Sequence, residues 1–432
     1  MKRVVFGMGI TLINNWDLIQ KEFNPDFAVD NNPDKWMTRD EYTGLVCYSF
    51  DDIKQIKNVD VLITVGDPYA IDAIKKQLDS ISIHYCVLME MMELWCRKLH
   101  LPTKIENMGK NVRKIILFNT PEHDNIGDHL IALSELNLIG ELFPKIPMYE
   151  ITDIEYMRYH ERIKKMIASD DLIIISGGGY MGSLWLYNCE TNVRRIIKEY
   201  PNNRIIIFPQ TVYFEGNSRG EREYQLSKEI YREHQGLTIC AREKKSYDLF
   251  VEILNSNDNV ILLPDIAFFY DEKMPIQKNR SNKCKVCFRR DKEAILSENE
   301  RICIIRELEK NGYMVEETSM HEGVFDIQYR KDYVTNKLKE LSEASLIVTD
   351  TLHCMISAAL VGSECLFFDN LSGKVKNVYE WIRTNRYIHY CDDIEAFQFI
   401  LKDLEIRDNI FILENKEKYK QLIEEMIMEG FS

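Results

Sequence analysis

Short apolar runs alternate with helical patterns along most of the 432 residues of this chain. One apolar run, at 346–348, leads into Thr349-Asp350-Thr351-Leu352-His353, and a new helical pattern follows at 354–360. Alternation of this kind predicts an α/β fold with parallel sheets. In such folds ligands bind beyond the carboxyl ends of the strands, where the helix N-termini point. The sequence therefore predicts a site at the strand ends.

The strand-like runs fall into three groups, which predict three α/β units. We expect a Rossmann-like accessory domain at 1–105, and two Rossmann-like domains at 112–270 and 283–432 that face each other across a cleft. The expected strands are at 4–6, 27–30, 59–65 and 81–85, at 114–118, 172–176, 204–208, 238–241 and 260–263, and at 285–288, 313–316, 346–348 and 365–368. Helices are expected at 129–142, 227–234, 298–311 and 415–428. Polar segments at 101–112 and 271–282 are the expected connections.

The composition excludes several classes of protein. A net charge of −14 argues against a protein that coats nucleic acid or an anionic membrane. The eleven cysteines are scattered, as in a protein of a reducing compartment. Cys284 and Cys287 have metal-like spacing but no second pair, so we expect structural cysteines and no metal.

The sequence also predicts a cytoplasmic protein. No apolar run approaches the roughly 20 residues that span a bilayer. Gly7 and Gly9 interrupt the first apolar run, which we interpret as a strand and not a signal peptide. Peripheral contact with a membrane is left open.

Gly7-Met8-Gly9 after the first strand, with Asp30 about twenty positions on, outlines a dinucleotide-binding fingerprint. Leu12 stands where the third glycine belongs, so the fingerprint is incomplete. We favour an accessory domain that uses its glycines only for a tight turn. A nicotinamide-dependent dehydrogenase is the alternative.

Two strand ends in the middle of the chain carry glycine motifs. Asn125, Gly127 and Asp128 follow the strand at 114–118. Gly127 lets the backbone approach a ligand, and Asn125 or Asp128 can cap the next helix; helix capping alone explains this motif equally well. Gly177-Gly178-Gly179 leaves backbone N–H groups open to an anion or a sugar.

Further strand ends carry polar and charged side chains. Gln210 and Tyr213 suit the hydroxyls and faces of a sugar. Arg242 either clamps a carboxylate or phosphate or pairs with a neighbouring acid. Three more cations, Arg289, Arg290 and Lys374, follow strands of the last unit, where a ligand and a solvated surface are equally good interpretations.

Together these motifs resemble the polysaccharide pyruvyl transferase family over about 114–381. The motifs are Asn125-Ile126-Gly127-Asp128, Gly177-Gly178-Gly179, Phe208-Pro209-Gln210-Thr211, Ala241-Arg242-Glu243 with Ser246-Tyr247, Pro264-Asp265, and Thr349-Asp350-Thr351-Leu352-His353 with Lys374. The resemblance implies a glycosyltransferase-B-like pair of Rossmann-type domains. It also implies phosphoenolpyruvate as donor and a pyruvate ketal on two hydroxyls of a sugar as product. The acceptor is expected on the 112–270 side and the donor on the 283–432 side, near Leu352, His353 and Arg242.

This chemistry assigns roles to the candidate residues. Phosphoenolpyruvate carries a carboxylate and a phosphate and so needs at least two cationic clamps. Its methylene carbon must be protonated by a group that titrates near neutral pH, which His353 supplies. Asp128 and His129 are candidate bases for the sugar hydroxyl. The expected acceptor or anion contacts are Asn125, Gly127, Gly177, Gly178, Gly179, Gln210 and Tyr213.

The chain departs from the family pattern at two positions. Many members have an arginine where Thr351 stands, so Arg289, Arg290 or Lys374 must compensate for the lost cation. Some members have a histidine at the position of Tyr213, which leaves the acceptor open. We expect a lipid-linked or nucleotide-linked sugar acceptor and no cofactor besides phosphoenolpyruvate as co-substrate. A nucleotide-sugar-dependent glycosyltransferase and a non-catalytic binding protein are the alternatives.

Overall fold

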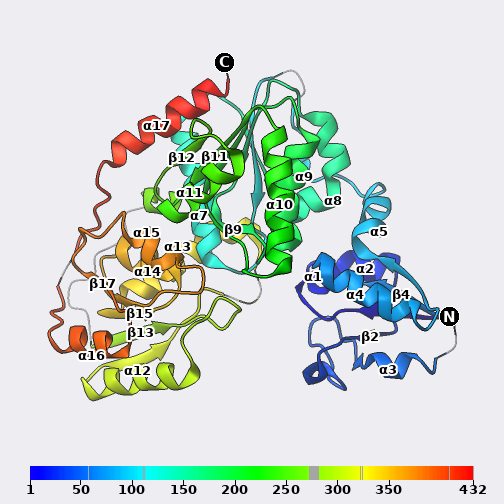
Figure 1. The fold of residues 1–432 in the computed structure, drawn as a ribbon, viewed down its shortest axis with the longest axis horizontal. Coiled ribbons are helices and arrows are strands. Elements are labelled where there is room, and N and C mark those ends of the chain that lie inside the picture. The colour runs from blue at the N-terminus through cyan, green and yellow to red at the C-terminus, as the bar shows by residue number, and fades with distance from the viewer. Residues whose placement is uncertain are drawn as a thin grey trace. The chain divides into compact units, whose positions relative to one another are not determined.

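The computed structural model describes residues 1–56, 58–109, 112–271, 282–321, 323, 325–407 and 409–431. It is an α/β protein with three parallel sheets, which confirms the predicted fold class (Figure 1). The chain divides into two compact units. One comprises Met1–Gly109 together with Asp153–Met166 and Trp185–Asn192, and the other holds the remainder, including two of the sheets.

The first unit has a five-stranded sheet in the order β3-β2-β1-β4-β5. Its strands are β1 (Lys2–Phe6), β2 (Phe27–Val29), β3 (Cys47–Tyr48), β4 (Val59–Ile63) and β5 (His84–Val87). Its helices are α1 (Ile10–Ile13), α2 (Trp16–Glu22), α3 (Phe50–Ile53), α4 (Pro68–Asp79), α5 (Leu88–Cys96), α6 (Thr103–Glu106) and α8 (Asp153–Ile163). Ile154 and Met157 of α8 join the apolar core of this unit, so a distant segment of the sequence completes it.

The glycine turn after β1 is tied to its own domain. The Asp30 carboxylate accepts hydrogen bonds from Met8 N at 2.8 Å and Lys35 Nζ at 3.1 Å. A Cβ at Gly7 would overlap the side chain of Val65. The carboxylate that a dinucleotide fingerprint would offer to a ribose thus already accepts hydrogen bonds within its own domain.

The second unit carries the other two sheets. The larger has the order β12-β11-β10-β8-β6-β7, with β9 pairing β10, and the smaller has the order β14-β13-β15-β16-β17. The larger is made of β6 (Ile115–Thr120), β7 (Met148–Thr152), β8 (Leu172–Ile175), β9 (Gly178–Gly182), β10 (Ile205–Tyr213), β11 (Leu237–Ala241) and β12 (Val260–Leu262). The smaller is made of β13 (Lys283–Cys287), β14 (Met314–Glu317), β15 (Leu346–Thr349), β16 (Glu364–Phe367) and β17 (Ile388–Tyr390).

Helices connect the strands of both sheets. They are α7 (Ile126–Leu142), α9 (Thr191–Glu199), α10 (Ser218–Glu233), α11 (Lys244–Leu254), α12 (Glu298–Lys310), α13 (Arg330–Ser342), α14 (Leu352–Leu360), α15 (Lys374–Tyr379), α16 (Ile394–Lys402) and α17 (Lys416–Glu429). No helix in the described ranges is long and apolar enough to cross a membrane.

One apolar core joins the two sheets of this unit. Helix α7 is apolar on nearly all sides, as a helix enclosed by other elements must be. Its Leu130 lies in one cluster with Leu338 of α13 and Met355 of α14. The last helix, α17, returns to the larger sheet, where Met426 contacts Cys240 of β11 (Figure 1). The part built on the larger sheet and the part built on the smaller sheet therefore share one apolar core, which brings the N-termini of α7 and α14 together.

The strand predictions hold for the central strands and for the edge strands β12 and β14, and the errors lie mainly at other edges. The strand expected at 81–85 begins instead at His84, because the N–H groups of Ile81 and Ile83 bond to Leu78 O and end helix α4. β3, β7, β9 and β17 were not predicted. β3, β7 and β17 are edge strands with part of their surface exposed, and β9 pairs only with β10 among the described strands. Most of the connection expected at 271–282 lies outside the described residues, as do positions 110 and 111 of the connection at 101–112.

Candidate active site

His353 lies in the first turn of α14, directly beyond the carboxyl end of β15, and is 7% exposed. The first turn of α7 packs against it. A Cβ at Gly127 would lie only 2.5 Å from both Cβ and Nδ1 of His353. Gly127 therefore leaves space for the imidazole ring, a different reason for glycine from the ligand approach that the sequence suggested. The two helix N-termini meet at this histidine.

Two carboxylates flank the His353 ring, one on each side. Asp128 Oδ1 lies 3.9 Å from Nδ1, and Asp265 Oδ2 lies 3.7 Å from Nε2. Both distances are longer than the donor–acceptor distance of a hydrogen bond. The ring thus lies between two acids, and its buried Nε2 has no hydrogen-bond partner among the described residues.

Both flanking acids are held in their ionised form. Burial opposes ionisation of Asp128, but the charges of His123 and His353 outweigh it and hold its pKa below the ordinary value. Asp265 is also buried, and its interactions with His353 and Arg242 hold its pKa well below the usual range. The acids can therefore stabilise a positive charge on the imidazole.

The neighbouring His129 has a different environment. Its Nε2 lies 2.5 Å from His123 O, and its Nδ1 accepts a hydrogen bond from Arg330 Nε at 3.2 Å. Its ring stacks on Phe325, with centroids 3.8 Å apart. Burial and the charge of Arg330 lower its pKa to about 3. Both ring nitrogens are engaged inside the protein, whereas the Asp128 side chain is 30% exposed.

Two cations from different sheets converge at Gly179. Arg242, after β11, is 1% exposed and donates to Asp265 Oδ2 and Thr211 Oγ1, both at 2.8 Å. Lys374 begins α15, and its Nζ lies 2.8 Å from both oxygens of Glu293. A Cβ at Gly179 would overlap Arg242 Nη2 and lie 3.3 Å from Lys374 Nζ. Only glycine leaves room for both cations here.

The rest of the glycine tract is tied to the protein. Gly177 N and Ser176 Oγ both donate to the buried Glu135 carboxylate at 2.7 Å, so the Gly177 N–H group is not open to a ligand. Burial raises the pKa of Glu135 to about 8 in spite of these bonds. Gln210 Nε2 donates to Ser176 O at 2.9 Å, and Gly178 has a positive φ of 150°. The tract thus forms a fixed floor beneath the two cations.

Three further candidate residues have mainly structural contacts. The Asn125 side chain caps α7 by accepting a hydrogen bond from Gly127 N at 3.0 Å. Leu352 is 1% exposed and belongs to the apolar core. Tyr213 ends β10, and Lys245 Nζ lies 5.9 Å from the centroid of its ring.

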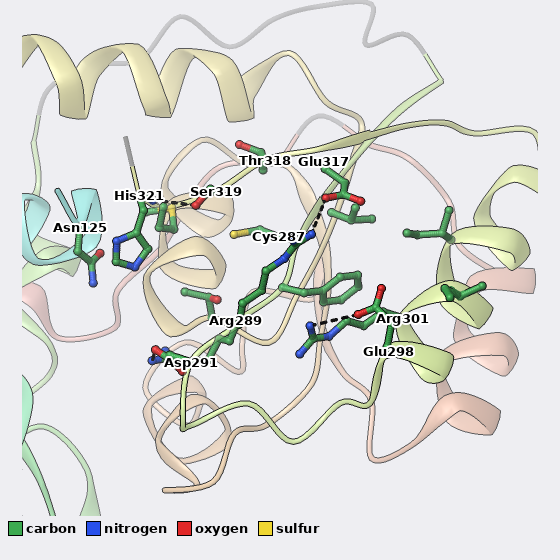
Figure 2. Close-up of a pocket in the computed structure, with 17 residues that line it drawn as sticks. Asn125, Cys287, Arg289, Asp291, Glu298, Arg301, Glu317, Thr318, Ser319 and His321 are labelled. Atoms are coloured by element: carbon green, nitrogen blue, oxygen red, sulfur yellow. Dashed lines mark hydrogen bonds and ion pairs between the residues drawn. The ribbon is translucent and has the colours of Figure 1, made fainter. Parts of the chain in front are cut away.

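Arg289 and Arg290 line a cavity of about 580 Å³ (Figure 2). The cavity lies beside the residues described above, and Asn125 and Thr351 are also part of its lining. The Arg289 guanidinium is bound by Asp291 and Glu293, each at 2.6 Å. The Arg290 side chain is 77% exposed and donates to Glu317 at 3.1 Å. Of the four candidate cations, Arg242 and Lys374 are therefore the two that meet beside the glycine floor.

Sequence reasoning missed three acids that position these groups. Asp265 holds Arg242 and faces His353, Glu293 holds Lys374, and Glu135 anchors the glycine tract. Glu135 had a visible signal, because it is an acid inside an almost wholly apolar helix. Asp265 follows a strand within one of the quoted motifs, whereas no local pattern marks Glu293.

Comparison with known proteins identifies the family. The sequence profile of the polysaccharide pyruvyl transferase family matches residues 125–372. This chain belongs to that family. The match begins at the cap of α7 and includes Arg242, Asp265 and His353. As a polysaccharide pyruvyl transferase family member the protein is a transferase, and the resemblance inferred from the strand-end motifs is confirmed.

Three individual proteins show what this chain is similar to. General stress protein 30 of Bacillus subtilis is 32% identical over 69% of this chain and 87% of that protein. Pyruvyl transferase 1 of Schizosaccharomyces pombe is 24% identical over 65% of this chain and 71% of that protein. A solved structure of an uncharacterised Klebsiella pneumoniae protein aligns with a TM-score of 0.47 at 22% identity, covering 66% of this chain and 95% of that chain.

Proposed function

We propose that this transferase moves pyruvate from phosphoenolpyruvate onto two hydroxyls of one sugar in a polysaccharide precursor, forming a ketal and releasing phosphate. The observation that carries the proposal is the convergence of Arg242 and Lys374 at Gly179, in the same cluster as a histidine flanked by two carboxylates. A small dianionic donor and a proton-transfer step both fit this arrangement.

The two cations bind the donor's carboxylate and phosphate. A buried anion without paired positive charge is very costly, so the donor must meet cations already present in the site. Asp265 and Thr211 fix the Arg242 guanidinium, and Glu293 fixes the Lys374 ammonium. Lys374 therefore supplies the charge that other members place at the position of Thr351. No further cofactor is needed, because phosphoenolpyruvate carries its own leaving group.

His353 acts as the general acid. When a sugar hydroxyl oxygen bonds to carbon 2 of phosphoenolpyruvate, the double bond must pick up a proton at carbon 3. His353 delivers this proton, and Asp128 and Asp265 on either side of its ring stabilise the imidazolium. The product of this step is a tetrahedral phosphate adduct with a new methyl group.

Asp128 acts as the general base. It is ionised, partly exposed and next to His353, whereas both nitrogens of His129 are already engaged. Asp128 takes the proton of the attacking hydroxyl. It then passes this proton to His353, which replaces the proton that His353 gave to carbon 3. The second hydroxyl then bonds to carbon 2 as the bond to the phosphate oxygen breaks, and its proton leaves with the phosphate.

The test uses the purified full-length protein with phosphoenolpyruvate and a panel of lipid-linked and nucleotide-linked sugars. We expect phosphate release that depends on a sugar, with pyruvate found on that sugar by mass spectrometry. His353→Ala should lower the rate by about 10²–10⁴-fold and leave the melting temperature close to that of the wild type. Release of nucleoside diphosphate from a nucleotide sugar, without use of phosphoenolpyruvate, would overturn the proposal in favour of a glycosyltransferase.

A further inference from the structure

A cavity lies beside the cluster formed by His353, Asp128, Arg242 and Lys374. It lies beyond the carboxyl ends of β13 and β14 and is closed on one side by α12 (Figure 2). Its volume of about 580 Å³ is in the range of cavities that bind small ligands. Phosphoenolpyruvate, with a three-carbon skeleton and one phosphate, is far smaller than this space.

The charges lining the cavity cancel. Arg289 is bound by Asp291, Arg290 by Glu317, and Arg301 Nη1 lies 3.7 Å from Glu298 Oε2. Three lining guanidiniums thus face three lining carboxylates. A neutral ligand with many hydroxyls can donate to these carboxylates and accept from these guanidiniums.

The lining also carries one unused donor and an apolar wall. Arg301 Nε is buried without a hydrogen-bond partner among the residues that the structure describes. Phe288, Ile302 and Ile305 form apolar surface beside the charged groups. Hydroxyl-binding groups next to apolar surface match a sugar ring, which has hydroxyls at its edge and C–H groups on its faces.

Two lining residues connect the cavity to the reacting groups. Thr351 immediately precedes Leu352 and His353, and Asn125 caps the helix that carries Asp128. His353, Asp128 and Arg242 do not line the cavity themselves. A group bound there thus lies next to the reaction centre without containing the reacting hydroxyls.

We propose that this cavity binds the sugar unit of the acceptor that neighbours the pyruvylated one, so that the enzyme recognises at least a disaccharide. The inference rests on the proposed function for the identity of the acceptor. The sugar is recognised by Arg301 and by the paired carboxylates of the lining, with its apolar face against Ile302.

The test measures sugar binding without phosphoenolpyruvate, by saturation-transfer NMR on the full-length protein. The probes are cellobiose, maltose and diacetylchitobiose, with methyl glucoside for comparison. Arg301→Ala removes the unused donor, and Ile302→Trp fills the cavity. The matched controls are Arg306→Ala, on the same helix but outside the cavity, and Leu226→Trp, which is 37% exposed where Ile302 is 38% exposed.

We expect the wild type to bind at least one disaccharide more tightly than methyl glucoside. Both cavity variants should weaken disaccharide binding by roughly tenfold or more and abolish this preference, because a charge-assisted hydrogen bond or the space itself is lost. Both controls should bind as the wild type does. Affinity for phosphoenolpyruvate, measured by calorimetry, should be the same in all four variants and also shows that they are folded.

Three results would overturn this inference. Disaccharide binding that is unchanged in both cavity variants would place the sugar elsewhere, and failure of every disaccharide to bind would exclude a sugar ligand. Loss of phosphoenolpyruvate affinity in Arg301→Ala would make the cavity part of the donor site. Because sugar binding is measured without the donor, a protein that binds disaccharides here but never consumes phosphoenolpyruvate would refute the proposed function alone.

Discussion

Replacing Gly127 by alanine should displace the His353 imidazole and leave the fold intact. A Cβ at this position would lie 2.5 Å from Cβ and Nδ1 of His353. Atoms in van der Waals contact are about 3.5 Å apart, so the histidine has to move by about 1 Å. Because its Cβ is itself too close, rotation of the ring alone does not relieve the overlap. A misplacement of about 1 Å in a catalytic group can lower the rate roughly a hundredfold.

The same substitution should not unfold the protein, because alanine is favoured over glycine in a helix by up to about 1 kcal/mol. The assay compares kcat for phosphate release with the melting temperature. The control is Gly140→Ala in the same helix, where a Cβ meets no other atom within 4 Å; it should keep wild-type kcat and equal or higher stability. A Gly127→Ala enzyme with wild-type kcat would refute the reasoning that His353 must hold this position.

Three further predictions follow from the contacts of the site. Arg242→Ala should raise the dissociation constant of phosphoenolpyruvate by roughly tenfold or more. Arg242→Lys should restore only part of the affinity, because lysine lacks the planar guanidinium that binds both Asp265 and Thr211. Unchanged affinity in calorimetry would contradict this prediction. Asp128→Asn should lower kcat by about 10²–10⁴-fold while His129→Gln lowers the melting temperature and keeps kcat, and the opposite pattern would reverse the assignment of the base. Burial raises the pKa of Asp350 to about 6, so this carboxyl favours the folded state at low pH and loses that contribution as the pH rises through 6. Asp350→Asn should therefore stabilise the protein at about pH 7.5, by at most about 3 kcal/mol, and much less at about pH 4.5; thermal melts that show the same difference at both pH values would argue against it.

The sequence by itself determined the fold class and the region of the molecule in which the candidate residues gather. Central strands of a parallel sheet are buried on both faces, so 172–176 and 346–348 are apolar enough to be recognised without any tertiary information. Parallel strands end at a common edge, so the polar motifs that follow them had to gather there. His353 and Arg242 could therefore be assigned to one region of the molecule from their positions along the chain.

Only the tertiary structure decided which of these residues face the site and which are buried against other parts of the protein. Asp128 and His129 are adjacent in sequence, but successive residues of a helix point about 100° apart, so one faces His353 and the other is buried against Phe325. The tertiary structure also shows why two positions require glycine. Gly127 leaves space for a histidine and Gly179 leaves space for two cations, each from a distant segment. The partners of Lys374 and α8 lie tens of residues away or more, and no local pattern encodes such contacts, because they depend on which surfaces the packed elements bring together.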